Sequence, residues 1–363
     1  MQLWCEQDIY QAIKTVGMLG MTVIESILLG GDGMDEFGGF LPLELPLCNK
    51  CYFSKYPDAS IKSLNCARNA IAFICICIKP EKIYIPYYNC EMVVNTLKRY
   101  GITYEQYYLT EKLFPDIEKI GEREWLLYVN YFGNIADRDI MAVCKKYSRV
   151  ILDNTQAFYA KPVIKENCYN IYSCRKFFGV GDGAYIVSAE DERMDSYEQL
   201  PIDKSWNRVA FLLRSIEEGT NAAYADSISN EANIGTEISR MSALTEHILN
   251  SIDYEKVRER RAENIKVLKR ELGEINQLPL AIHSENLMVY PFYYRNIYLR
   301  RVLIKNKIYT PQWWKYLIGI VQEGSVEFKY SQWLYPLPVD QRYEEKDMLK
   351  LCAKVKRLLK GEN

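Results

Sequence analysis

The sequence predicts an α/β protein with a three-layer, mostly parallel sheet, followed by a smaller C-terminal α+β domain. Three observations predict this fold. Short runs rich in β-branched and aromatic residues alternate with helical segments between residues 60 and 190, the pattern of strands joined by covering helices. The run WLLYVNY at Trp125–Tyr131 is nearly all apolar, which is typical of a strand buried on both faces. The alternation stops near residue 195, so a second kind of structure is expected from there.

The elements of the first part have recognisable start and stop signals. A helix is expected at Cys66–Lys79, with Asn65 placed to cap its N-terminus. Lys82–Pro86 is a short β-rich run that a proline ends. The other elements predicted here are helices at Glu91–Tyr100 and Asp137–Tyr147, and strands at Thr103–Leu109, Trp125–Tyr131, Arg149–Asp153, Cys168–Ser173 and Ala184–Ser188.

Residues 195–270 are helical and charged in pattern. They include a long helix predicted at Ser242–Leu272, whose run KVRERR we interpret as a solvated face without a binding role. The remaining predicted elements are a strand at Leu287–Tyr294 and helices at Asn296–Lys305 and Lys346–Leu359.

We divide the chain into an N-terminal extension of uncertain role at 1–37, a large α/β domain at 38–245 and a small α+β domain at 246–363. The apolar stretch at residues 15–30 contains Glu25 and is too short to span a membrane. Residues 1–13 contain no Lys or Arg, unlike the start of a signal peptide. One hypothesis is that Met34, which begins a more globular stretch, is the natural start.

Composition disfavours several classes of function. The 46 Lys and Arg against 47 Asp and Glu give a net charge of −1, which argues against nucleic acid as a partner. No P-loop motif is present. Only two histidines occur, His247 and His283, far apart in the chain, so no metal site is expected. Eleven cysteines, an odd number partly inside apolar runs, indicate reduced thiols in the cytoplasm. The single CxxC, Cys48–Cys51, has no second pair at zinc spacing.

Polar side chains follow the ends of the predicted strands, where ligands bind in open α/β sheets. They include one carboxylate, one lysine and one helix start. Pyridoxal 5′-phosphate (PLP) requires this set, because its aldehyde bonds to a lysine, its ring nitrogen pairs with an anion and its phosphate binds amides at a helix N-terminus. The groups are Asn65–Arg68, Tyr87–Cys90, Asn130–Asn134, Asp153–Gln156 and Ser173–Lys176.

Seven segments resemble the sugar aminotransferase family called DegT/DnrJ/EryC1/StrS, a family of fold-type I PLP enzymes. They occur in the family's order over roughly residues 38–345, and the block from Asp153 to Gly183 is the most specific. The segments are LNCARNAI (64–71), KIYIPYYNCEMV (82–93), YVNYFGN (128–134), VILDNTQAFYAKP (150–162), SCRKFFGVGDGAYIVS (173–188), SRMSAL (239–244) and LPVDQRY (337–343).

The resemblance implies roles for the residues that contact the cofactor ring. Lys176 would bond covalently to the aldehyde carbon of PLP. Asp153 would pair with the pyridinium nitrogen, and Gln156 would lie near the phenolic oxygen. Cys90 or Tyr88 would lie against the ring face.

The resemblance also implies a phosphate site, formed by the amides of Ala67 and Arg68 with the hydroxyl of Ser173. This chain departs from many relatives there. Cys66 and Ala67 stand where Ser and Gly are usual, and Ile171 stands where the phosphate-binding serine is usual. Ile238 and Ser239 stand before Arg240, where an asparagine often reaches the partner subunit's phosphate.

The reaction that the resemblance implies is transamination in two stages. An amino acid, glutamate in most relatives, would convert PLP to pyridoxamine 5′-phosphate (PMP). The amine would then pass to a keto group of a nucleotide-linked sugar, in the biosynthesis of cell-surface polysaccharides or other amino sugars, with Lys176 moving the proton. A homodimer is expected by analogy with fold-type I enzymes.

Three other interpretations stay open. A sugar dehydratase of the same family would carry histidine in place of the lysine, so Lys176 argues against it. A catalytically inactive relative could serve as a sugar-nucleotide binding protein, and the altered phosphate positions support that interpretation. In a generic α/β protein without PLP, Asp153 and Lys176 would form a structural ion pair.

Overall fold

The computed structural model describes residues 43–46, 50–234 and 236–361. The chain divides into two compact units, Met1–Leu45 and Pro46–Asn363. Only residues 43–45 of the first unit are described, so the fold below is that of the second. The apolar stretch at 15–30, the Met34 start and Cys48 of the CxxC pair lie outside the described residues.

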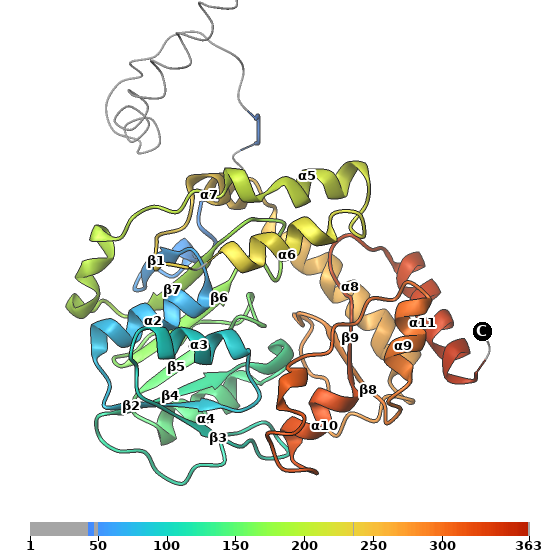
Figure 1. Cartoon of the computed structure of the whole chain (residues 1–363), viewed down its shortest axis with the longest axis horizontal. Coiled ribbons are helices and arrows are strands. Elements are labelled where there is room, and N and C mark those ends of the chain that lie inside the picture. Colours follow the sequence, from blue (N-terminus) through green and yellow to red (C-terminus); the bar gives the residue numbers. More distant parts are fainter. Residues whose placement is uncertain (1–42, 47–49, 235, 362–363) are drawn as a thin grey trace, which may run out of the picture. The chain divides into compact units, whose positions relative to one another are not determined.

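A seven-stranded sheet forms the centre of this unit, in the order β1-β7-β6-β5-β4-β2-β3 (Figure 1). Strand β7 is antiparallel to both of its neighbours, and the other neighbouring pairs are parallel. The predicted mostly parallel α/β sheet is therefore confirmed. The strands are β1 (Ser60–Leu64), β2 (Lys82–Pro86), β3 (Tyr104–Tyr107), β4 (Glu124–Val129), β5 (Val150–Asp153), β6 (Cys168–Ser173) and β7 (Ala184–Ser188).

Helices cover this sheet and continue beyond it (Figure 1). Helix α2 contacts α3, β6 and β7. The helices of the larger part are α2 (Ala67–Ile78), α3 (Glu91–Arg99), α4 (Asp137–Lys146), α5 (Ala210–Glu217), α6 (Tyr224–Asn233) and α7 (Ala243–Asn250). Short 3₁₀ helices are η1 (Tyr52–Lys55), η2 (Tyr131–Gly133), η3 (Glu192–Gln199) and η4 (Trp206–Arg208).

Two hydrophobic clusters lie on opposite faces of the sheet at β6 and β7. Because side chains alternate along a strand, Ile186 enters the larger cluster with α2. Its neighbours Tyr185 and Val187 enter a smaller, mostly aromatic cluster with Phe158 and Phe177. Strands β6 and β7 are therefore buried on both faces, as the apolar strand pattern predicts.

The C-terminal part contains a two-stranded antiparallel sheet of β8 (Tyr290–Tyr293) and β9 (Leu334–Leu337). Helix α11 (Glu345–Leu359) packs against α8 (Tyr254–Leu272) and α9 (Leu299–Lys305), which gives the predicted smaller α+β arrangement. The remaining elements are α10 (Val326–Trp333) and η5 (Lys315–Leu317). The domain boundary at 245/246 stays a prediction.

Two helix predictions are wrong. The expected helix at Ser242–Leu272 is two helices, because Asp253 starts α8 anew by accepting a 3.0 Å hydrogen bond from Lys256 N. Asn65 does not cap α2. The N-cap is Cys66, without a side-chain cap bond, because the Asn65 side chain bonds to Asn69 and to the Glu237 carbonyl instead.

The interpretation of KVRERR as a solvated face is wrong for its last residue. Arg261 is 1% exposed. Its guanidinium donates to the carbonyls of Leu287 and Met288 at 3.1 and 2.7 Å and to Gln341 Oε1 at 3.2 Å. Arg261 therefore fastens α8 to the segment before β8.

Within the described part of the chain, no helix is long and apolar enough to cross a membrane.

Candidate active site

Strands β4, β5 and β6 run parallel, so their carboxyl ends meet at one edge of the sheet (Figure 1). Asn130 N, just after β4, donates to the Asp153 carbonyl at 2.9 Å, and Asn154 N donates to the Ile171 carbonyl at 2.8 Å. Strand β1 runs parallel to β6, because both are antiparallel to β7. The start of α2 therefore lies at the same edge.

Asp153 is the carboxylate of this edge. It is buried, and Oδ1 accepts a 2.9 Å hydrogen bond from Thr155 N. Burial raises the pKa of Asp153 above its ordinary value, while the bonds from Thr155 and the positive charge of Lys176 act to lower it. Lys176 is therefore near enough to act on the carboxyl.

No ion pair joins Asp153 and Lys176, both of which the structure describes. The interpretation of these two residues as a structural ion pair is therefore wrong. A buried carboxyl within the electrostatic influence of a lysine, but without a direct cationic partner, fits a site that a bound cation such as a pyridinium would complete.

Lys176 is exposed, whereas the residue after it is firmly held. The Phe177 ring is buried against Phe158 and Tyr159. The Phe177 carbonyl accepts a 2.8 Å hydrogen bond from Gln341 Nε2, in the segment LPVDQRY. The backbone at Lys176 is therefore anchored, while its amine is accessible to a ligand.

Gln156 is positioned by the backbone of the segment YFGN. Phe132 N donates a 2.8 Å hydrogen bond to Gln156 Oε1. This requires a tight turn, in which Phe132 has φ of 62° and Gly133 has φ of 77°. A Cβ on Gly133 would lie 2.9 Å from the Gln156 carbonyl oxygen. With its side-chain oxygen engaged, Gln156 can offer its amide NH₂ to a ligand.

The segment that carries Lys176 also meets the start of α2. Gly183 N donates to the Asn65 carbonyl at 2.6 Å, and Cys174 N donates to the Gly183 carbonyl at 3.1 Å. Ser173 is buried at the end of β6. The first amides of α2, including those of Ala67 and Arg68, have no partner within the helix. These donors form an anion-binding edge.

Arg175 and Glu231 belong to this edge; Arg175 lies in the predicted group Ser173–Lys176 without a role of its own, and Glu231 was not predicted. Arg175 and Arg68 both form ion pairs with Glu231, and the Arg68–Glu231 distance is 3.1 Å. Arg175 Nε is buried and has no hydrogen-bond partner within residues 50–234 and 236–361. A carboxylate held by two guanidinium groups occupies the kind of place that a phosphate takes, so the residues present fit PLP at this end too.

The two candidates for the ring face differ in exposure. Tyr88 is fully buried, its ring edge-on to Trp314 at 4.2 Å, and its hydroxyl has no partner in the described part of the chain. Cys90 is half-buried and is the N-cap of α3. Cys90 is therefore the more accessible of the two.

The segment SRMSAL runs beside β1 and holds the glycine-rich loop after Lys176. Buried Asp182 accepts hydrogen bonds from Ser242 N at 2.7 Å and Ser242 Oγ at 2.6 Å, and it also accepts from Thr245 Oγ1. Met241 N donates to the Ser63 carbonyl at 3.0 Å. These bonds fix the loop between Lys176 and β7.

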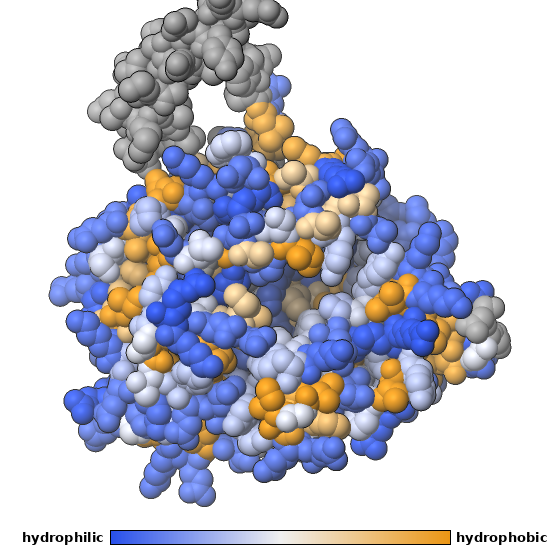
Figure 2. All heavy atoms as spheres, in the orientation of Figure 1, coloured by the Kyte–Doolittle hydropathy of each residue, from blue (hydrophilic) through white to orange (hydrophobic). Residues whose placement is uncertain are grey.

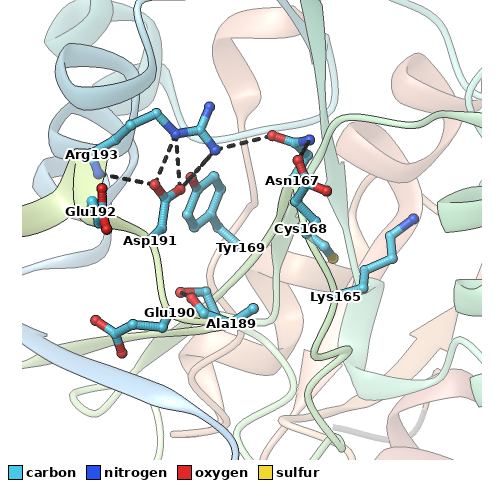
Figure 3. Close-up of a pocket in the computed structure, with 11 residues that line it drawn as sticks. Lys165, Asn167, Cys168, Tyr169, Ala189, Glu190, Asp191, Glu192 and Arg193 are labelled. Atoms are coloured by element: carbon cyan, nitrogen blue, oxygen red, sulfur yellow. Dashed lines mark hydrogen bonds and ion pairs between the residues drawn. The ribbon is translucent and has the colours of Figure 1, made fainter.

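Two cavities lie at different edges of the sheet. One of about 300 Å³ opens at the turn that contains Gly133 and is lined by Asn130, Asn134 and His283, among others. The other, of about 420 Å³, lies at the opposite edge, around the start of β6 and the end of β7 (Figure 3). There Arg193 donates to Asp191 at 2.7 Å and to Asn167 at 3.1 Å, so the charge of Arg193 is paired with that of Asp191.

The chain shares its fold with structurally characterised aminotransferases, while sequence comparisons return nothing. No protein-family model matches it, and no curated protein sequence matches it. DesV from S. venezuelae aligns with a TM-score of 0.63 at 16% identity, over 96% of this chain and 96% of that chain. A DegT DnrJ EryC1 StrS aminotransferase from Brucella abortus aligns with a TM-score of 0.62 at 12% identity, over 97% of this chain and 95% of that chain. The sugar aminotransferase CalS13 from Micromonospora echinospora gives 0.59 at 16% identity, over 82% and 86%.

Proposed function

From this shared fold, we propose that the chain is a PLP-dependent sugar aminotransferase. The observation that carries the proposal is electrostatic. Lys176 acts on the buried carboxyl of Asp153, and its neighbour Arg175 belongs to a cationic cluster at the start of α2. PLP has the matching polarity, with a protonated ring nitrogen at one end and a phosphate at the other. Spr1654 from Streptococcus pneumoniae, a similar fold at 12% identity, is described in PLP and PMP forms.

Three residues would act on the reacting end. Lys176 Nζ would bond to the aldehyde carbon and, once released, move a proton between the substrate's α-carbon and the cofactor. Asp153 would keep the ring nitrogen protonated, and Gln156 would donate to the phenolic oxygen. Bound PLP supplies an electron sink that stabilises negative charge at that α-carbon.

The remaining predicted residues would hold the cofactor in place. The amides of Ala67 and Arg68 and the hydroxyl of Ser173 would bind the phosphate. Of the two ring-face candidates, we favour Cys90, because Tyr88 is enclosed by aromatic side chains.

The substrates belong to the same proposal. An amino acid, with glutamate the expected donor, would give its amine through PMP to a keto group of a nucleotide-linked sugar. The product would serve polysaccharide or other amino-sugar biosynthesis. The similarity in fold to proteins described as sugar aminotransferases supports this assignment.

We also propose a cytoplasmic homodimer. The described cysteines are free thiols, as expected in a reducing compartment. Large apolar side chains are exposed around α5 and α6, where Figure 2 shows hydrophobic surface, and a second copy would cover them. They are Trp206, Leu213, Ile216, Tyr224 and Ile228.

Visible spectroscopy tests the cofactor assignment. PLP added to the wild-type protein should give an absorbance band that borohydride removes, and peptide mass mapping should then place the added mass on Lys176. Lys176→Ala should fold without the band, and Lys161→Ala, which changes another exposed lysine, should keep it. A wild-type spectrum that does not respond to PLP would refute the proposal.

A substrate screen tests the reaction. Nucleotide-linked keto sugars are incubated with glutamate and the holoenzyme, and mass spectrometry follows formation of the amino sugar and of 2-oxoglutarate. Bound cofactor without turnover of any sugar would favour the interpretation as a binding protein.

A further inference from the structure

Two arginines and one carboxylate form a compact ionic cluster at the start of α2. Arg68 Nη1 lies 3.1 Å from Glu231 Oε1, and Arg68 Nη2 donates to the Ile234 carbonyl. Arg175 contacts both oxygens of Glu231, with Nη2 at 3.4 Å from Oε1. The cluster therefore joins three separate parts of the chain, namely α2, the residue before Lys176, and α6.

The side chain of Arg68 is buried and that of Arg175 largely so, whereas the carboxylate is half-exposed. The side chains of Arg68 and Arg175 are 9% and 21% exposed, whereas Glu231 is 49% exposed. Burial acts to raise the pKa of Glu231, but the hydrogen bonds and charges of Arg175 and Arg68 outweigh it, so the pKa is lowered and Glu231 is ionised at neutral pH. Glu231 can leave the cluster for solvent, while two buried cations cannot remain unpaired at low cost.

The cluster also has more positive than negative character. Two guanidinium groups share one carboxylate, and Arg175 Nε has no acceptor among the residues that the structure describes. Cys66, the N-cap of α2, lies within the electrostatic influence of Arg68, Arg175 and Glu231, and the positive end of the α2 dipole adds to the field there. An anion with more charge and more acceptor atoms than a carboxylate would satisfy the site better.

We propose that Arg68 and Arg175 form a clamp for the phosphate group of PLP, and that Glu231 is the resident counter-ion which the phosphate displaces. This inference rests on the proposed function in taking the anion to be the phosphate of PLP. It gives side-chain roles to Arg68, of which only the amide was assigned above, and to Arg175. A phosphate offers three oxygens to the guanidinium donors, and the displaced Glu231 turns to solvent.

The test compares PLP with pyridoxal, which lacks the phosphate, in spectroscopic titrations of the apoprotein. Arg175→Gln should weaken PLP binding by about 10- to 100-fold, the usual effect of losing a hydrogen bond to a charged group, and should leave pyridoxal binding nearly unchanged. Glu231→Gln should have the opposite effect and strengthen PLP binding, because the carboxylate that competes with the phosphate is gone. Arg193→Gln removes a paired arginine at the opposite edge of the sheet (Figure 3) and should leave the affinities for PLP and for pyridoxal unchanged.

The outcomes separate this inference from the proposed function. Equal effects of Arg175→Gln on PLP and pyridoxal, or weaker PLP binding by Glu231→Gln, would overturn the clamp while leaving the PLP enzyme intact. Should Arg175→Gln fail to fold, Glu231→Gln alone decides. Failure of wild-type protein to bind PLP would sink the proposed function. In that case, stabilisation of wild-type but not Arg175→Gln by inorganic phosphate in a thermal melt supports an anion clamp, and its absence overturns one.

Discussion

The guanidinium of Arg261 lies 4.7 Å from the centroid of the Phe177 ring, and Phe177 follows Lys176 directly in the chain. The same guanidinium donates to Gln341, whose amide donates to the Phe177 carbonyl. Helix α8 and the segment LPVDQRY thus hold the lysine segment through one buried side chain.

Replacement of Arg261 should therefore be costly. Arg261→Met keeps much of the side-chain volume but leaves the carbonyls of Leu287 and Met288 buried without their donor. We expect a loss of about 3 kcal/mol in the free energy of unfolding, measured by urea denaturation. Arg258→Met, at a half-exposed position of the same helix, should change it by less than about 0.5 kcal/mol. Similar values for the two variants would contradict the anchoring role.

Gly133→Ala should be more harmful than its backbone angle alone explains. Gly133 has φ of 77°, and an added Cβ would lie 2.9 Å from the Gln156 carbonyl. Gly101→Ala is the matched control, since Gly101 has φ of 65° with nothing within 4 Å of the added carbon. The control should lose about 1 kcal/mol, and Gly133→Ala should lose more and also weaken PLP binding. Equal losses, with PLP affinity unchanged, would mean that the turn does not position Gln156.

Asp153 should lower the stability of the apoprotein at neutral pH. Burial raises the pKa of Asp153, so the folded state holds the Asp153 proton more tightly than the unfolded state does. The free energy of unfolding therefore falls as the pH rises from the pKa of the unfolded state to the raised pKa of the folded state. Asp153→Asn should accordingly become more stable than wild type as pH increases from about 4 towards 7. Thermal melts at several pH values measure this. A stability difference between Asp153→Asn and wild type that does not change with pH would show that burial of the ionised Asp153 carboxylate does not destabilise the fold.

The oligomeric state should depend on α5. Ile216 is 83% exposed, and Ile216→Glu places a charge in the apolar surface proposed for a second copy. We expect wild-type protein to sediment as a dimer and the variant to dissociate. Ile297→Glu, at another exposed isoleucine away from α5, should remain dimeric. A monomeric wild-type protein in analytical ultracentrifugation would refute the homodimer.

The sequence predicted the central sheet well because buried strands are apolar and end at polar residues. Strands β2, β5, β6 and β7 lie where the pattern placed them. Strand β1, SIKSL, was not predicted, because it is an outermost strand of the sheet, pairs with one neighbour and remains half-buried. The break between α7 and α8 was missed, because Asp253 reads as one more charged residue in a helical run.

The sequence predicted the site residues that directly follow strands, because parallel strands bring their carboxyl ends together. It missed the residues that only tertiary contacts bring into the site. Asp153 and Lys176 could be predicted because they lie at or just after the ends of predicted strands. The partners of Glu231 lie far from it in the chain, and a sequence with this many charges of both signs does not indicate which of them meet. Arg261 did leave a signal, since it shares helical spacing with the buried residues Ile265 and Leu268, which places it on the apolar stripe.

The antiparallel insertion of β7 has a structural consequence for the lysine. Because β6 and β7 are neighbours in space and run in opposite directions, the chain leaves the sheet at Ser173 and re-enters it at Ala184 in the next strand. Lys176 therefore sits on a short loop tied at both ends to the same rigid hairpin. Closing so short a loop costs little entropy, so the backbone at Lys176 is positioned before any ligand binds.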